Sequence, residues 1–173
     1  MARDQVDMTP ISSRDELVAW FEAGCKPKDK FRVGTEHEKF AFTVDGHAPV
    51  PYGGPRGIRA LLDGMHDLLG WDPIMEGENI IGLADVTGGG AISLEPGGQF
   101  ELSGAPVETV HETAGELFAH LAQVREVAKP LGIGFLGLGM TPKWRRADMP
   151  VMPKGRYKIM TAYMPKVGTL GLD

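Results

Sequence analysis

The strongest constraint on the fold comes from residues 93–103, SLEPGGQFELS, in which apolar and polar residues alternate. Side chains of a β-strand point to opposite faces in turn, so this alternation predicts strands with one buried face. The two sets are Ile92, Leu94, Phe100 and Leu102 on one parity and Ser93, Glu95, Gln99, Glu101 and Ser103 on the other. The central Pro96-Gly97-Gly98 can reverse or bulge the strand, and a bulge would break this parity.

A second stretch, residues 31–44, alternates in a similar way and contains GTEHEKF. Glu36 and Glu38 are two positions apart, so both carboxylates project from one face at a separation of about 6–7 Å. The same parity continues into Phe40 and Phe42, so the face is not plainly solvent. Two like charges at this distance repel unless a positive group lies between them. The pair is therefore either a solvated strand face or part of a cation site.

Four acidic residues on neighbouring strands would make an all-oxygen site: Glu36, Glu38, Glu95 and Glu101. Hard cations such as Mg²⁺ bind carboxylate oxygens, and Mg²⁺ usually also binds substrate phosphates. Burying several acids without a cation would cost too much free energy. We therefore expect these residues to hold Mg²⁺ beside a nucleotide.

Basic residues gather in KWRRADMPVMPKGRYK (143–158), although the chain as a whole is acidic. They are Lys143, Arg145, Arg146, Lys154, Arg156 and Lys158, against the single acid Asp148. Three prolines, Pro142, Pro150 and Pro153, would hold this loop semi-rigid. The loop is either a solvated surface or a clamp for phosphates or carboxylates, which Arg contacts in planar, bidentate geometry.

Periodicity predicts an α+β fold, a mostly antiparallel sheet with helices packed on one face. Helices are expected at 13–24, 55–69, 106–129 and 156–163, and strands at 31–44, 78–84, 91–95, 98–103 and 132–140. His111 and His120 lie on the long third helix and are expected at its surface. Residues 1–12 are interpreted as a flexible lead-in. We expect residues 13–173 to be the N-terminal part of a single domain, in which the last residues, VGTLGLD, begin a further strand and the domain is left incomplete.

Composition argues against several classes of protein. The net charge of −5 disfavours a nucleic-acid surface, which needs a basic field. The single cysteine, Cys25, excludes an internal disulfide framework and fits a reducing compartment. The N-terminus, MARDQVDMTP, lacks the apolar core of a secretory signal, and no apolar run approaches membrane-spanning length. We therefore expect a cytoplasmic protein with no membrane or nucleic-acid partner.

The chain resembles glutamate–cysteine ligase of the plant and proteobacterial type. The similar stretches are GTEHEKF, MEGENIIGL (75–83), SLEPGGQFELSGAP (93–106), GIGFLGLG (132–139), PKWRRADMPVMPKGRY (142–157) and YMPKVGTLGLD (163–173). The resemblance implies a catalytic fold like that of glutamine synthetase, with Mg²⁺ as cofactor and ATP as co-substrate. It also implies that the γ-carboxyl of L-glutamate is joined to the amine of L-cysteine through an acyl phosphate, the first step of glutathione biosynthesis.

The resemblance also assigns roles to individual residues. The expected metal ligands, which face the nucleotide and the glutamate, are Glu36, Glu38, Glu95 and Glu101. The residues expected to contact substrate or nucleotide are Arg156, Lys143, Arg145, Arg146 and Glu101. Glu38 and Arg156 are the expected catalytic residues, because one holds the metal and the other binds the glutamate substrate.

Two further hypotheses stay open at this point. One is another carboxylate–amine ligase on the same scaffold, whose amine substrate is not cysteine. The other follows from the greater length of chains in this family: a non-catalytic piece that binds only Mg²⁺ or glutamate.

Overall fold

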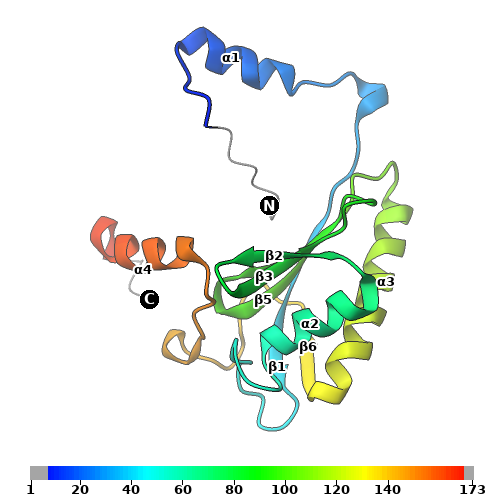
Figure 1. Cartoon of the computed structure of the whole chain (residues 1–173), viewed down its shortest axis with the longest axis vertical. Coiled ribbons are helices and arrows are strands. Elements are labelled where there is room, and N and C mark those ends of the chain that lie inside the picture. Colours follow the sequence, from blue (N-terminus) through cyan, green and yellow to red (C-terminus); the bar gives the residue numbers. More distant parts are fainter. Residues whose placement is uncertain (1–7, 170–173) are drawn as a thin grey trace.

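The computed structural model describes residues 8–169, with an antiparallel sheet at the centre of the molecule (Figure 1). The strands are β1 (Glu36–Thr43), β2 (Asp72–Glu76), β3 (Asn79–Ala84), β4 (Ala91–Glu95), β5 (Gln99–Ser103) and β6 (Ile133–Leu136). Their order is β2-β3-β4-β5-β1-β6, and all neighbours pair antiparallel. The expected α+β class with a mostly antiparallel sheet is confirmed.

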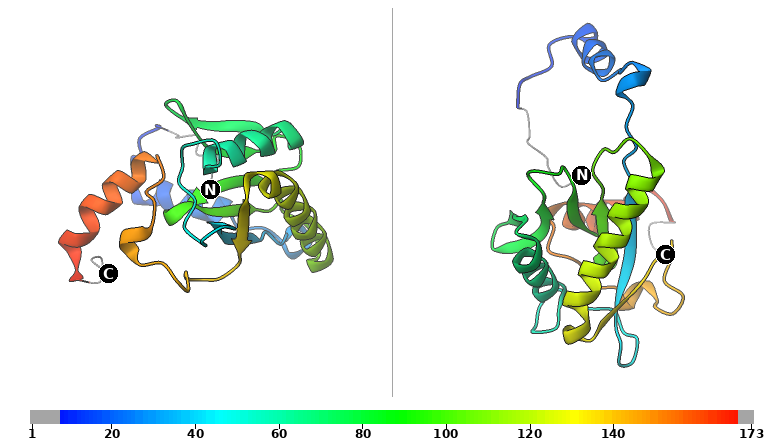
Figure 2. Two further views of the ribbon diagram at one scale, coloured as in Figure 1. Left: turned by 90° about the horizontal axis from the view of Figure 1, so that it is seen from below. Right: turned by 90° about the vertical axis from the view of Figure 1, so that its right-hand side faces the viewer.

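Two helices, α2 (Ile58–Leu69) and α3 (Val110–Leu131), lie on the same side of the sheet (Figure 2). The buried residues of α2 follow the spacing i, i+3, i+4, i+7 of a single helix face; they are Ile58, Leu61, Leu62 and Met65. They share a core with Leu94 and Phe100 of the central strands. Burying each such side chain stabilises the fold by about 1.5–3 kcal/mol. The apolar parity expected around residues 92–102 is therefore the core face of the sheet.

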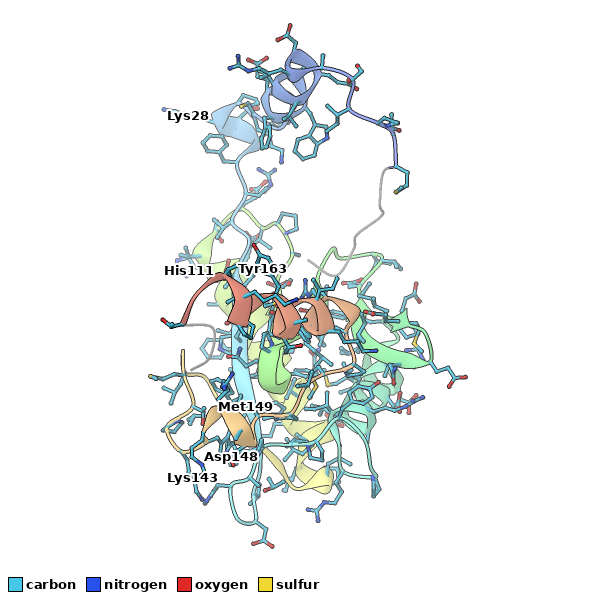
Figure 3. All side chains as sticks on the ribbon, turned by 90° about the vertical axis from the view of Figure 1, so that its left-hand side faces the viewer. Lys28, His111, Lys143, Asp148, Met149 and Tyr163 are labelled. Carbon is cyan, nitrogen blue, oxygen red and sulfur yellow. The ribbon has the colours of Figure 1, made fainter. Side chains whose placement is uncertain are left out.

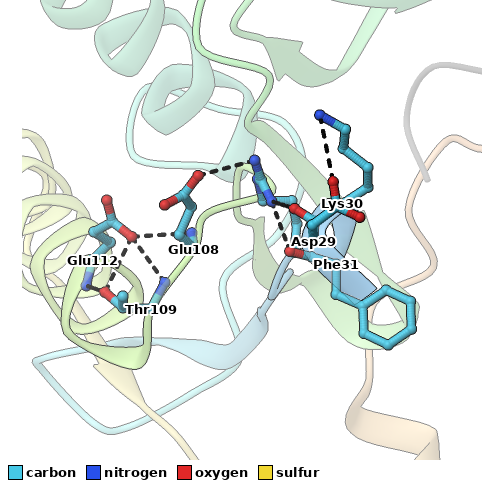
Figure 4. Close-up of polar contacts among 7 residues, drawn as sticks. Asp29, Lys30, Phe31, Glu108, Thr109 and Glu112 are labelled. Atoms are coloured by element: carbon cyan, nitrogen blue, oxygen red, sulfur yellow. Dashed lines mark hydrogen bonds and ion pairs between the residues drawn. The ribbon is translucent and has the colours of Figure 1, made fainter. Parts of the chain in front are cut away.

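The start of α3 lies four residues later than expected because a capping box defines it. The hydroxyl of Thr109 accepts a hydrogen bond from the backbone N–H of Glu112, whose carboxylate accepts one from the Thr109 N–H (Figure 4). These bonds satisfy N–H groups that the first turn leaves without partners. Arg32 also pairs with Glu108 at 2.9 Å, tying the segment before β1 to the start of α3.

The strands differ from expectation mainly where pairing stops. The expected strand 31–44 is regular only over β1, and the expected strand 132–140 only over β6. β2 is absent from the expected elements because Pro73 and two acidic ends give it little strand character. β2 is tolerated because it is an edge strand, paired only with β3. Pro73 has no N–H to donate, and an edge strand has no second neighbour that needs one.

The remaining helices are α1 (Arg14–Ala23), which lies apart from the core (Figure 1), and α4 (Gly155–Val167), which contributes the buried Tyr157 to it. All residues of α1 are exposed, and α4 lies on the other side of the sheet from α3 (Figures 1 and 2). Short 3-10 turns occur at Lys28–Lys30, Pro96–Gly98 and Arg146–Asp148.

Both ends of the chain bear on earlier expectations. α4 extends past its expected end and includes Val167, so the strand expected from that residue does not begin there. Residues 170–173 of that expected strand, like residues 1–7 of the expected lead-in, lie outside the described part of the chain.

His120 is buried, contrary to expectation, whereas His111 is exposed as expected. His120 is four and eight residues before the buried Val124 and Ala128, so it lies on the core face of α3. Its ring stacks on Phe100 with centroids 6.3 Å apart. Burial, with smaller effects from nearby Lys39 and His37, lowers the pKa of His120 from 6.5 to about 3.

We expect His120 to make the fold sensitive to acid. Between about pH 6.5 and 3, the unfolded chain binds a proton at this residue that the folded chain does not. Stability therefore falls as the pH is lowered through this window, by up to about 1.4 kcal/mol per pH unit. Urea unfolding of His120→Leu should show a smaller loss between neutral and mildly acidic pH. The exposed control, His111→Leu, should keep the original slope; equal slopes in all three proteins would contradict the prediction.

Candidate functional site

The β4–β5 hairpin determines how Glu95 and Glu101 are related. Pro96-Gly97-Gly98 forms a turn that reverses the chain, with Gly97 in the left-handed conformation at φ 76°. Glu95 pairs with Gln99, and Ser93 pairs with Glu101, so the parity survives the turn. Glu95 and Glu101 therefore project from one face of the sheet as diagonal neighbours.

β1 brings the other two acids to the same face. Glu38 lies directly opposite Glu101 in the β1–β5 ladder, and Glu36 lies opposite Ser103. Opposed residues on antiparallel strands share a face. Four carboxylates from three neighbouring strands thus lie on the face that α2 and α3 leave uncovered. We call this surface the acidic face; it comprises Glu36, Glu38, Glu95 and Glu101.

Glu101 is buried but well supplied with hydrogen-bond donors. It is 3% exposed, and the hydroxyls of Ser93 and Ser103 donate to its two oxygens at 2.7 and 2.8 Å. Burial alone would raise the pKa of Glu101, but these hydrogen bonds outweigh it, and the pKa lies below its ordinary value. Glu101 therefore stays ionised at neutral pH.

Glu95 is half-buried and contacts two residues in the first turn of α4. The Arg156 guanidinium donates to it at 3.0 Å and lies over the ring of Tyr157, 5.5 Å from the centroid. The Tyr157 hydroxyl lies 3.5 Å from the other oxygen of Glu95. Burial raises the pKa of Glu95, while the charges of Lys154 and Arg156 oppose that shift. The structure thus brings together two of the predicted site residues, Glu95 and Arg156.

The donor atoms of the acidic face suit a hard cation, but the four carboxylates do not converge on one point in this structure. All four predicted ligands are carboxylates, and Glu36 and Glu38 are exposed at the start of β1. Within residues 8–169, however, no three His, Cys, Asp or Glu side chains are gathered closely enough to hold a metal ion. Glu95 is engaged by Arg156, and Glu101 by two serines. The side chains would have to turn toward a common point to bind Mg²⁺.

Two residues close to Arg156 in the chain fasten it to the sheet: Lys154, one of the basic residues of the loop, and Tyr157, which sequence reasoning missed. Lys154 is 7% exposed, and its ammonium donates to the backbone carbonyl of Leu94 at 2.7 Å. The Tyr157 hydroxyl donates to the same carbonyl at 2.8 Å. Burial raises the pKa of Tyr157 to about 12, so the phenol keeps its proton. Lys154 is two residues before Arg156 and Tyr157 is the residue after it, and this closeness in the sequence is the signal that could have identified them.

The other predicted basic residues are held elsewhere. The Lys143 ammonium donates to the Gly46 carbonyl at 3.1 Å, near the turn after β1. Arg145 forms an ion pair with Asp148 at 3.3 Å. Arg146 lines a hollow of about 360 Å³ between the loop before α4 and the β4–β5 turn. Figure 3 shows Lys143, Asp148 and Met149 on this loop, and Tyr163 on α4.

The hollow beside Arg146 is mainly apolar and is bordered by three methionines, Met149, Met152 and Met160. Tyr157 and Pro96 also line it, so it adjoins the Glu95–Arg156 pair. An apolar pocket with a few polar groups at its edge is the usual form of a small-molecule site.

A buried lysine lies on the reverse side of the sheet from the acidic face. Lys39 is 1% exposed, and its ammonium donates to the Phe100 carbonyl at 2.9 Å. Burial lowers the pKa of Lys39 to about 8, although Glu101 opposes the shift. At neutral pH the ammonium remains mostly protonated, so a positive charge lies on the opposite side of the sheet from the acidic face.

Known proteins match this chain along most of its length. The glutamate-cysteine ligase family 2 (GCS2) matches residues 32–173. Over 170 residues, the chain is 58% identical to a chloroplastic glutamate–cysteine ligase of Arabidopsis thaliana, covering 98% of this chain and 32% of that protein. Identity to chloroplastic glutamate–cysteine ligase A of Oryza sativa subsp. japonica is 54%, covering 98% and 34% respectively. The chain therefore spans about a third of the length of these relatives.

The expected cytoplasmic location is contradicted by these relatives, which are named chloroplastic. The single cysteine fits a reducing compartment, but it does not distinguish one reducing compartment from another. In residues 8–169, no helix has the length and apolar character needed to cross a bilayer.

Proposed function

Because the chain belongs to glutamate–cysteine ligase family 2, we propose that it is part of an enzyme that joins L-glutamate to L-cysteine with ATP and Mg²⁺. The observation that supports this most is the acidic face, where four carboxylates lie on three strands beside Arg156. Such an arrangement suits a metal–nucleotide site next to a carboxylate-binding group. The reaction would be the first step of glutathione biosynthesis.

The proposed reaction has two steps. A carboxylate is a poor acyl donor, so an oxygen of the glutamate γ-carboxylate first attacks the terminal phosphorus of ATP, giving an acyl phosphate and ADP. The cysteine amine then attacks the acyl carbon through a tetrahedral intermediate; the C–N bond forms, the amine loses a proton and phosphate leaves. Positioning and neutralisation of oxygen charge are the main contributions that a protein makes to such chemistry.

The acidic face would hold the metal. Bound Mg²⁺ supplies neutralising charge to the phosphate oxygens. Glu36 and Glu38 are open to solvent and would bind it first, and Glu95 and Glu101 would complete the site. The low pKa of Glu101 favours this role, because the residue is ionised before a cation arrives.

Arg156 would bind a carboxylate of the glutamate substrate. Its planar guanidinium matches a carboxylate in bidentate geometry, and it already holds the Glu95 carboxylate at 3.0 Å. A substrate carboxylate that replaced Glu95 on Arg156 would free Glu95 to turn toward the metal. Lys143, Arg145 and Arg146 remain proposed contacts for nucleotide or substrate, and Arg146 is the one beside the apolar hollow.

The direct test is product analysis with a panel of amino acids. The polypeptide encoded by the complete natural reading frame is incubated with glutamate, ATP, Mg²⁺ and one amine at a time. We expect γ-glutamylcysteine as the main product, with ADP and phosphate released in equal amounts. A dominant product with another amine would identify a different carboxylate–amine ligase. No product, together with calorimetric binding of Mg²⁺ or glutamate, would identify a non-catalytic binding protein.

A further inference from the structure

The last residue of edge strand β2 touches the first residue of α4. The carboxylate of Glu76 accepts a hydrogen bond from the backbone N–H of Gly155, 79 residues later in the chain. We propose that Glu76 is a positioning residue for Arg156, which follows Gly155 directly. This inference rests on the proposed function, in which Arg156 binds the substrate carboxylate.

The contact supplies what the start of α4 otherwise lacks. Lys154 is the N-cap residue of α4, and its side chain makes no capping hydrogen bond. The first N–H groups of a helix have no partner within the helix, and the helix dipole favours a negative charge there. A carboxylate that accepts from the first helical N–H answers both requirements through a charge-assisted bond.

Arg156 depends on this first turn because the rest of α4 is poorly anchored. Beyond the turn, Ile159 and Tyr163 are 71% and 58% exposed. Lys154 and Tyr157 both bond to Leu94, so they attach the turn to β4 at one point. Glu76 contacts the turn from β2, which is two strands away from β4 in the sheet. This second contact limits rotation of the turn about its attachment to Leu94.

At position 155, only glycine leaves room for this contact. A Cβ atom added to Gly155 would lie 2.6 Å from the nearer oxygen of Glu76. That distance is well inside van der Waals contact, so an alanine would displace the carboxylate. The contact can therefore be broken independently from either side, by Glu76→Ala or by Gly155→Ala.

The kinetic test uses these two variants in the complete polypeptide, with Glu78→Ala as the matched control. Glu78 is an exposed acid on the neighbouring β2–β3 turn. We expect both test variants to raise the KM for glutamate about tenfold, the effect of one lost charge-assisted hydrogen bond. The kcat and the KM for ATP should stay within about twofold. Glu76→Gln keeps an acceptor oxygen and should restore most of the affinity for glutamate.

A second readout needs no activity and is made on this chain by NMR. The Gly155 amide signal should shift in Glu76→Ala, the Arg156 Nε–H signal should shift in both Glu76→Ala and Gly155→Ala, and neither signal should shift in Glu78→Ala. An unmoved Arg156 signal, or an unchanged KM for glutamate in an active enzyme, would overturn the positioning role. If the unmutated enzyme makes no product, the proposed function fails by itself, and the Arg156 signal still decides whether Glu76 positions that side chain.

Discussion

Glu38→Gln should lower Mg²⁺-dependent ATP turnover at least about a hundredfold. Glu38 lies directly opposite Glu101 at the centre of the acidic face and is exposed to solvent. The amide keeps the shape of the side chain but removes the charge that would attract the cation. Because no core contact changes, the free energy of unfolding should stay close to that of the unmutated protein.

The measurement is ATP hydrolysis coupled to ligation, made over a range of Mg²⁺ concentrations in the complete polypeptide. Glu78→Gln is the control, since it removes an exposed acid outside the acidic face. Excess Mg²⁺ should partly restore the activity of the Glu38→Gln enzyme if the loss lies in metal binding. Unchanged turnover in a folded Glu38→Gln protein would rule out the assignment of this residue as a ligand.

Arg156→Ala should raise the KM for glutamate by about two orders of magnitude, the usual effect of removing one partner of a hydrogen-bonded charge pair. The KM for ATP should change much less, because the role proposed for Arg156 is to bind the glutamate carboxylate, whereas the metal at the acidic face would neutralise the phosphates. Arg156→Lys should recover only part of the loss, since an ammonium cannot make the bidentate contact.

Steady-state kinetics with glutamate and ATP varied separately distinguish this role from a general loss of structure. Lys158→Ala is the matched control, because it removes an exposed cation two residues further along α4. Equal increases in both KM values would argue against a carboxylate clamp at Arg156. A comparable effect in Lys158→Ala would point instead to the overall charge of α4.

Local patterns were sufficient to predict much of the fold. The spacing of Ile58, Leu61, Leu62 and Met65 predicts α2, since a helix repeats its faces at this interval. β2 could not be predicted because its pairing with β3 outweighs its weak strand character. His120 was misjudged because its type suggested the surface, whereas its position relative to Val124 put it in the core.

The order of residues in the β4–β5 hairpin was sufficient to put Glu95 and Glu101 on one face of the sheet. A strand alternates its side chains and a three-residue turn preserves the parity, so the acids of β4 and β5 had to share a face once the turn formed. The sequence was also sufficient to identify the family, because the motifs typical of it are spread along most of the chain. Both properties depend on the order of residues within short segments.

Which positive groups meet these acids depends on long-range contacts in the folded chain. Six basic residues were candidates in the loop 143–158, and the structure brings Arg156 to Glu95 and Lys154 to Leu94, across 61 and 60 residues. It also brings Glu76 to the start of α4. Such contacts depend on how a distant loop docks against two strands, and no periodicity within the loop encodes that docking.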